Sequence, residues 1–207
     1  RRLSGCAATH SSTPPVLDWY TQTRYGLDED APTFNDSVFE HIKRHQIPIV
    51  ILSARWSSYA ARSGHDGTPF APSLLATVRR LISIGSQPWI LMDVPQHRFD
   101  IPKTLAQAIW FGTGVESLCT RPTADNAWDG FLYQTIDEIA RTGGRVIDPK
   151  PRFLSPDGRY YLVELDGVVL YRDRGHLTTS GARRVLLPLL RDALGEKLEM
   201  ASRSLDG

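Results

Sequence analysis

Two long apolar runs limit this chain to a small set of folds. They are the segments 47–54 (IPIVILSA) and 89–94 (WILMDV). Continuous apolar runs of this length are typical of strands that are buried on both faces, as in a parallel sheet. An amphipathic helical pattern lies between them, and further helical patterns flank them. This alternation predicts an α/β architecture, a three-layer α/β/α sandwich in which helices cover both faces of a parallel sheet.

The last third of the chain supplies one hairpin signal and one more strand. Asp166-Gly167 separates the apolar runs 160–165 and 168–171, which predicts a β-hairpin with a two-residue turn. A short strand is expected over 145–148, after a pair of glycines. Only three strands of the parallel sheet are therefore visible, fewer than such sheets usually contain.

Helical periodicity divides the rest of the chain, and all 207 residues are expected to form a single domain. Ser73 is expected to cap the second helix, and Pro188 to bend the last one. We expect residues 1–34 to be irregular, residues 95–126 to form a long excursion and residues 195–207 to be a disordered tail. The expected helices cover residues 34–45, 73–84, 103–111, 128–142 and 179–194.

Charge and composition exclude several classes of protein. The chain has 24 Lys and Arg against 23 Asp and Glu, so it lacks a broad basic field and we expect no nucleic-acid partner. No run of 18 apolar residues is present, which argues against a transmembrane helix. Neither GxGxxG nor GxxxxGK[ST] occurs, so the nucleotide-binding folds that need these loops are disfavoured. Cys6 and Cys119 leave one disulfide and two thiols as open alternatives.

The clearest candidate for chemistry is the segment just before the last expected helix. Asp173 and His176 are three residues apart in a turn, which can place the carboxylate against the imidazole Nδ1. The other ring nitrogen, Nε2, then faces outward as a base for a serine hydroxyl, as in an acid–base–nucleophile triad. The alternative is that Asp173 caps the helix and His176 is an ordinary surface residue.

The stretch LYRDRGHLTTSGA (170–182) resembles the last block of the SGNH hydrolase superfamily. More narrowly, it resembles the extracytoplasmic SGNH domain that is fused to membrane acyltransferase-3 proteins. Three other blocks resemble that family in the same order: IVILSARWSSY, WILMDVPQHRFDIPKTLA and RVIDPKPRF. The resemblance implies an SGNH-type sandwich, in which Asp173 and His176 are two members of a catalytic triad.

The chain departs from the family's pattern in two places. The Gly-Asp-Ser motif of the nucleophile is absent. The resemblance places this motif before Arg1, so we expect the serine and the first strand or strands upstream, and residues 1–207 alone to lack esterase activity. The family's oxyanion-hole Asn is also missing. Its place, after the first apolar run, is held by Arg55 and Trp56.

We expect Arg55 to stabilise an oxyanion or to bind an anionic sugar, with an ion pair to a nearby acid as the alternative. Trp56 is a candidate for stacking on a sugar ring, but packing in the core is the favoured interpretation.

Other polar residues are secondary candidates. Ser53 ends the first apolar run and could serve as a nucleophile, although such a serine is more often a buried hydroxyl. His97 and Arg98 follow the second run and could line a cleft. His65 and Asp66 suggest a metal site, but no third ligand with suitable spacing is evident. We expect neither a metal nor an organic cofactor.

The resemblance implies a role in acyl transfer. The chain would be the periplasmic SGNH domain of an enzyme that O-acylates, usually O-acetylates, a cell-surface polysaccharide. Its partners would be the glycan acceptor and the membrane-embedded acyltransferase-3 domain of the same polypeptide, which tethers it to the inner membrane. Two alternatives stay open: a stand-alone SGNH carbohydrate esterase, and a catalytically inactive glycan-binding or structural domain.

Overall fold

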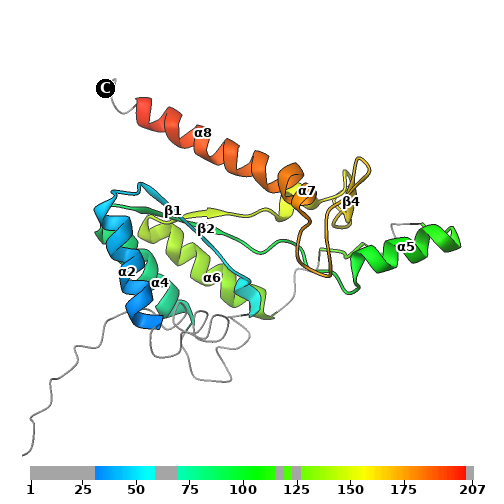
Figure 1. The fold of residues 1–207 in the computed structure, drawn as a ribbon, viewed down its shortest axis with the longest axis horizontal. Helices are drawn as coiled ribbons and strands as arrows, with labels where there is room; N and C mark the ends of the chain where they lie inside the picture. Colours follow the sequence, from blue (N-terminus) through cyan, green and yellow to red (C-terminus); the bar gives the residue numbers. More distant parts are fainter. Residues whose placement is uncertain (1–30, 59–69, 115–118, 123–126, 204–207) are drawn as a thin grey trace, which may run out of the picture. The chain divides into compact units, whose positions relative to one another are not determined.

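The structure, a computed structural model, describes residues 31–58, 70–114, 119–122 and 127–203 (Figure 1). The chain divides into two compact units. Unit 1 comprises Arg1–Ile90 and Ala127–Val146, and unit 2 comprises Leu91–Asn126 and Ile147–Gly207. The expectation of a single domain stays a prediction.

Helices and strands alternate along the first two thirds of the described chain, as the apolar runs predict. In chain order the elements are α2 (Ala31–Arg44), β1 (Ile49–Ser53), α4 (Phe70–Ser83), β2 (Gln87–Leu91), α5 (Ile101–Phe111), α6 (Ala127–Thr142), β3 (Arg145–Ile147), η3 (Lys150–Phe153), β4 (Glu164–Leu165), β5 (Val168–Val169), α7 (Thr179–Gly181), η4 (Ala182–Leu186) and α8 (Leu187–Arg203).

The main sheet has three parallel strands in the order β1-β2-β3, which confirms the predicted α/β fold with a parallel sheet. The central strand β2 is buried, and Trp89 and Ile90 have no exposed surface. The prediction that the 47–54 run is buried on both faces is wrong, because 41% of Ile51 is exposed. The reason is that β1 lies at the edge of the described sheet and has one neighbouring strand there.

In unit 1, α2 and α4 pack against β1 through a small apolar cluster built on Phe39, Ile42 and Leu81. An ion pair between Arg80 and Asp36 joins the two helices, with 2.7 Å between Nη2 and Oδ1. The Arg80 guanidinium also lies over the Phe39 ring, 3.9 Å from its centroid. This contact combines cation–π attraction with the ion pair in one place.

The helix starts differ from those predicted. α2 begins at Ala31, so the irregular segment is shorter than 1–34. α4 begins at Phe70, and Ser73 therefore does not cap it. Ser73 is buried inside the helix, where its carbonyl accepts a hydrogen bond from the Thr77 hydroxyl. The helix starts three residues before the serine, and the buried Phe70 at its first position explains this earlier start.

In unit 2, the Asp166-Gly167 hairpin is present. β4 and β5 pair antiparallel, with Leu165 opposite Val168. Both turn residues have positive φ, 51° at Asp166 and 79° at Gly167, which is the backbone of a type I′ turn. The strands are shorter than predicted because the preceding residues pair elsewhere: the Leu162 amide donates to the Phe153 carbonyl at 2.7 Å.

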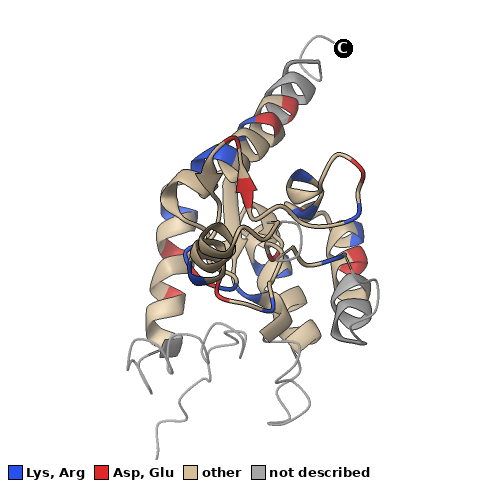
Figure 2. Cartoon of the chain, turned by 90° about the vertical axis from the view of Figure 1, so that its right-hand side faces the viewer, with Lys and Arg blue, Asp and Glu red and all other residues tan. Residues whose placement is uncertain are grey.

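The C-terminal helical region begins as predicted and ends later. A π-helical stretch, η4, separates α7 from α8 just before Pro188. Proline lacks an N–H and its ring crowds the preceding turn, so a wider turn at this point is expected. The predicted disordered tail from residue 195 is wrong as far as Arg203, where α8 ends. This segment is rich in Glu, Lys, Leu, Met and Ala, which favour helix. Both acidic and basic residues are present on the coloured part of α8 (Figure 2).

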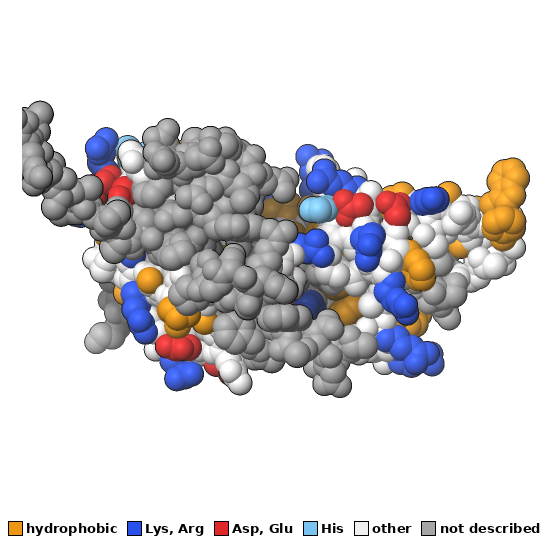
Figure 3. Space-filling model, turned by 90° about the horizontal axis from the view of Figure 1, so that it is seen from below, with side chains coloured by type: hydrophobic (Ala, Val, Ile, Leu, Met, Phe, Trp, Pro, Cys, Tyr) orange, Lys and Arg blue, Asp and Glu red, His pale blue; other side chains and the backbone are white. Residues whose placement is uncertain are grey.

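The excursion over 95–126 contains α5, which ends at Gly112 in the left-handed conformation. Hydrophobic side chains gather at this end of the helix (orange, far right in Figure 3), where Ile109, Trp110 and Phe111 are exposed. Among the helices of the described residues, none combines the length and the apolar character needed to cross a bilayer.

Two glycines in the C-terminal helical region should respond in opposite ways to alanine. Gly181 packs against the Leu170 carbonyl so closely that a Cβ would overlap it, whereas a Cβ on Gly195 would meet open space. We expect Gly181→Ala to lower the free energy of unfolding by about 2 kcal/mol or more. Gly195→Ala should raise it by about 0.5–1 kcal/mol, because alanine favours helix.

Urea denaturation followed by circular dichroism measures both changes. Equal effects of the two substitutions would contradict the close packing of α7 on Leu170.

Candidate functional site

The structure brings Asp173 and His176 together. They lie in unit 2, in the turn between β5 and α7, and the Asp173 Oδ2 is 2.7 Å from the His176 Nδ1. The same carboxylate accepts two backbone hydrogen bonds through Oδ1, from the amides of Gly175 and His176, each at 2.8 Å. The spacing of three residues thus gives the side-chain geometry that the sequence predicts.

Flanking residues close this turn and connect it to the helix. Tyr171 and Leu177 form an antiparallel bridge, and the Arg172 amide donates to the His176 carbonyl at 2.9 Å. Thr178 caps α7, because its Oγ1 accepts a hydrogen bond from the Gly181 amide at 2.8 Å. The turn is therefore held by backbone pairing at its base and by the Asp173 carboxylate at its tip.

The protonation state of Asp173 follows from these contacts. Desolvation raises its pKa, but hydrogen bonds from the Gly175 amide, the His176 amide and the His176 ring outweigh it and lower the pKa to about 2. An ionised carboxylate only accepts hydrogen bonds, so the His176 Nδ1 must carry the donated proton. The neutral imidazole then has its lone pair on Nε2, where it can accept a proton from a hydroxyl.

A second histidine, His97, is hydrogen-bonded to the turn that holds Asp173. Its backbone amide donates to the Arg174 carbonyl at 2.8 Å, and the Arg174 Nε donates to the His97 carbonyl at 3.4 Å. The neighbouring Gln96 amide packs so closely on Gly175 that a Cβ there would overlap it. The short segment after β2 therefore fixes the position of the turn that holds Asp173.

The His97 ring is buried, and its role differs from the cleft-lining one that the sequence suggested. Only 3% of the residue is exposed. Its Nδ1 lies 3.1 Å from the Thr120 Oγ1, and its edge meets the Tyr171 ring with 4.4 Å between centroids. In the described structure, the His97 Nε2 and the Tyr171 hydroxyl are buried without a hydrogen-bond partner. Burial lowers the pKa of His97 to about 4 and raises that of Tyr171.

Three of the sequence-predicted residues belong to unit 1. Ser53 ends β1, and Arg55 and Trp56 follow it. Arg55 is exposed, and it forms no ion pair with another described residue. Trp56 is only 4% exposed, and its ring lies 6.3 Å from that of Phe70, which is the core-packing alternative. Ser53 is exposed rather than a buried hydroxyl.

His65, Asp66 and Cys6 lie outside the described residues, as does the question of a Cys6–Cys119 pair. Cys119 is half-buried and packs against the apolar cluster around Tyr171. In the part of the chain that the structure describes, no three His, Cys, Asp or Glu side chains are placed to hold a metal ion.

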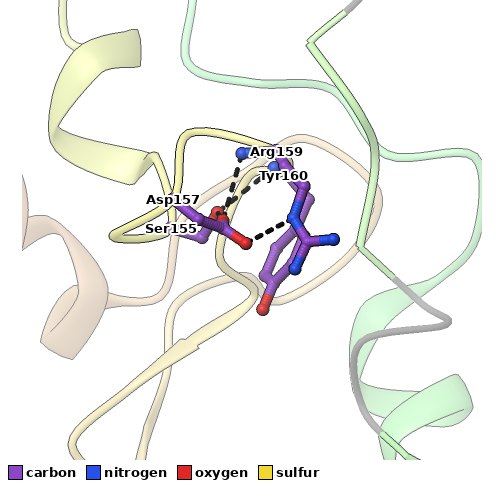
Figure 4. Close-up of polar contacts among 4 residues, drawn as sticks. All are labelled: Ser155, Asp157, Arg159 and Tyr160. Carbon is purple, nitrogen blue, oxygen red and sulfur yellow. Dashed lines mark hydrogen bonds and ion pairs between the residues drawn. The ribbon is translucent and has the colours of Figure 1, made fainter.

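Sequence reasoning missed one polar cluster, between η3 and β4 (Figure 4). The Ser155 Oγ donates to Asp157 at 2.6 Å, and the same Oγ accepts from the Tyr160 amide at 3.2 Å. Asp157 also accepts hydrogen bonds from the backbone and the Nε of Arg159. The Ser-x-Asp-Gly pattern around Gly158, whose φ is 70°, was a signal for this turn but not for the side-chain contacts within it.

The α/β fold with a parallel sheet agrees with an SGNH-type domain. The family model described as "SGNH domain (fused to AT3 domains)" matches residues 1–189, and the chain belongs to this family.

A comparison with solved structures bears on the fold. The periplasmic domain of a lipopolysaccharide acetyltransferase from Salmonella ser. Paratyphi A is similar in structure, with a TM-score of 0.56 and 20% sequence identity. The match covers 81% of this chain and 63% of that one, so the chain spans less than two thirds of the solved domain. No curated protein matches the sequence.

The burial of neutral His97 should make the fold sensitive to acid. The ordinary pKa of histidine is 6.5 and that of folded His97 is about 4, so between these values the unfolded chain binds a proton that the folded chain does not. The free energy of unfolding should therefore fall as the pH falls from 6.5 to 4, by up to roughly 3 kcal/mol from this residue.

His97→Asn keeps a side-chain amide near Thr120 and removes the titration. Urea denaturation at several pH values should show a shallower loss of stability in this variant over that range. His45→Asn, at an exposed position just after α2, is the matched control and should keep the wild-type slope. An unchanged slope in His97→Asn would contradict the burial of a neutral ring.

Proposed function

We propose that this chain is the periplasmic SGNH domain of an acyltransferase that O-acetylates a cell-surface polysaccharide. Membership of the family fused to AT3 domains already gives it an acyltransferase-associated role. The observation that carries the proposal further is the 2.7 Å hydrogen bond between Asp173 and the His176 Nδ1, in a turn that several backbone contacts fix.

In the proposed reaction, His176 moves the protons and Asp173 holds the ring. The Nε2 of His176 takes the proton of a serine hydroxyl while the serine oxygen attacks the acetyl carbonyl of the donor. The donor's leaving group departs with that proton, and an acetyl-serine remains. The Nε2 then takes the proton of a sugar hydroxyl, whose oxygen attacks the acetyl group, and the serine leaves as a hydroxyl after the proton returns to it.

The serine is proposed to come from outside these residues, because no Gly-Asp-Ser motif occurs in the 207 residues. The acetyl group is proposed to arrive through the AT3 domain of the same polypeptide, which also tethers the domain to the inner membrane. No metal or organic cofactor is needed for this sequence of steps.

Arg55 is the proposed partner for the oxyanion or for an anionic sugar. It is exposed at the end of β1, and ligands bind beyond the carboxyl ends of strands in open α/β sheets. A guanidinium there can donate hydrogen bonds to a developing negative charge. Trp56 is buried, which leaves little of its ring exposed for stacking on a sugar. The proposed contact between β1 and the substrate therefore rests on Arg55.

A stand-alone carbohydrate esterase is the second candidate, and the exposure of the pair favours it. The His176 side chain is 59% exposed and that of Asp173 37%, so water can reach the base as easily as a sugar can. The two functions share one mechanism and differ in whether water or a sugar hydroxyl accepts the acyl group.

The test is acetyl transfer to polysaccharide by the full-length protein. We expect His176→Ala and Asp173→Asn to lower the rate by roughly 10²–10⁴-fold, because general acid–base catalysis is lost. His45→Ala, which removes an exposed histidine just after α2, should leave the rate unchanged. Wild-type transfer by His176→Ala would contradict the proposal, and release of free acetate without any polysaccharide product would favour the esterase.

The same assay tests Arg55. Arg55→Ala should lower kcat by roughly 10²–10³-fold if the guanidinium stabilises the oxyanion. The free energy of unfolding should change by less than about 1 kcal/mol, since the residue is exposed. Early unfolding of this variant, with normal turnover by the molecules that stay folded, would assign Arg55 a structural role instead.

A further inference from the structure

Unit 2 contains a pocket of about 430 Å³, and four described residues line it: Cys119, Arg121, Arg159 and Tyr160. Two of the four are arginines, and the mechanism proposed above uses none of them. We propose that this pocket binds the anionic group of an acidic sugar residue, a uronate or a sugar phosphate, in the glycan acceptor. This proposal rests on the proposed function, because it names the class of substrate.

The turn beneath the pocket holds Arg159 in place. Its Nε donates to Asp157 (Figure 4). Hydrogen bonds from Ser155 and Arg159 lower the pKa of Asp157 to about 2, so the carboxylate stays charged at neutral pH. Asp157 therefore holds the guanidinium of a residue that lines the pocket. A planar fork of this kind suits a carboxylate or a phosphate.

Arg121 comes from a different part of the chain, and a backbone hydrogen bond joins the two walls of the pocket. The Tyr161 amide donates to the Thr120 carbonyl at 2.8 Å, which holds the segment around Arg121 beside Tyr160. Arg121 is exposed and Tyr160 half-buried. The two arginines thus reach the pocket from segments about forty residues apart.

The size and the remaining wall of the pocket favour a sugar over an isolated inorganic ion. Pockets for small organic ligands usually measure about 300–1,000 Å³, and this one is near the lower end of that range. Tyr160 adds an aromatic ring with a polar hydroxyl, which can pack against the apolar face of a pyranose and also bind its hydroxyls. A single acidic sugar residue matches the volume, the ring and the two cations together.

A short series of contacts ties the pocket to the candidate catalytic turn. Thr120, between two pocket residues, meets the His97 Nδ1 through its Oγ1 at 3.1 Å. The His97 amide in turn donates to the Arg174 carbonyl at 2.8 Å, next to Asp173. All these residues belong to unit 2, so the pocket and the turn are parts of one compact body. A sugar bound in the pocket would therefore have a fixed position relative to Asp173 and His176.

The test is a titration of residues 1–207 with small ligands, in which ¹H–¹⁵N NMR measures binding. The probes are glucuronate, glucose 6-phosphate and neutral glucose. We expect saturable shifts at the amides of the four pocket residues, and a Kd for at least one acidic probe about tenfold or more below that for glucose. A preference for glucuronate would identify the source as a uronate, and a preference for glucose 6-phosphate would identify it as a sugar phosphate.

Substitutions distinguish binding in the pocket from non-specific electrostatic attraction to positively charged residues elsewhere. Arg121→Gln should raise the Kd of the acidic probe about tenfold. Arg183→Gln removes the same charge from an exposed position in η4 of the same unit and should change the Kd less than about twofold. The spectrum of Arg121→Gln also reports whether the variant is folded, and Arg159→Gln provides a second test from the other wall.

Equal binding of glucose and the acidic probes, shifts confined to residues elsewhere, or equal effects of Arg121→Gln and Arg183→Gln would overturn the proposal. The result is independent of acyl transfer, because binding needs neither the serine nor the donor. Loss of binding with intact transfer in the full-length protein would reject the pocket alone. Intact binding with normal transfer by His176→Ala would reject the proposed function alone.

Discussion

The candidate site depends on one carboxylate, that of Asp173. One of its oxygens accepts the amides of Gly175 and His176 and so folds the turn, while the other accepts the His176 Nδ1 and so orients the ring. Each of these bonds favours the charged form, which is why the carboxylate stays ionised and the ring must donate. The same hydrogen bonds that build the local backbone therefore also determine which ring nitrogen is available as a base.

The side chains of Asp173 and His176 are partly exposed to solvent, whereas the residues that contact the turn from the protein interior are buried. His97 and Tyr171 are buried behind it, each with one polar atom that lacks a partner in the described structure. Such an atom costs about 1–3 kcal/mol, and the surrounding apolar cluster, which includes Phe153 and Leu170, offsets this cost. The arrangement places a fixed support directly beneath a solvent-accessible base, which suits catalysis on a large glycan.

Features set by neighbouring residues could be predicted from the sequence, whereas those set by distant packing could not. The Asp166-Gly167 turn and the Asp173–His176 hydrogen bond need only a few residues, and both are present. The exposure of β1 depends on its place at the edge of the described sheet, which a five-residue pattern does not encode. The burial of His97, and the pocket between the segments at Arg121 and Arg159, likewise arise from contacts between remote parts of the chain.

The most direct test of this account is the tautomer of His176, measured by ¹⁵N NMR on histidine-labelled protein at a pH where the ring is neutral. The account predicts that Nδ1 carries the proton and that Nε2 is unprotonated, because the Asp173 carboxylate accepts from Nδ1. A neutral His176 with its proton mainly on Nε2 would contradict it, since that ring could not take a proton from a hydroxyl at the exposed nitrogen.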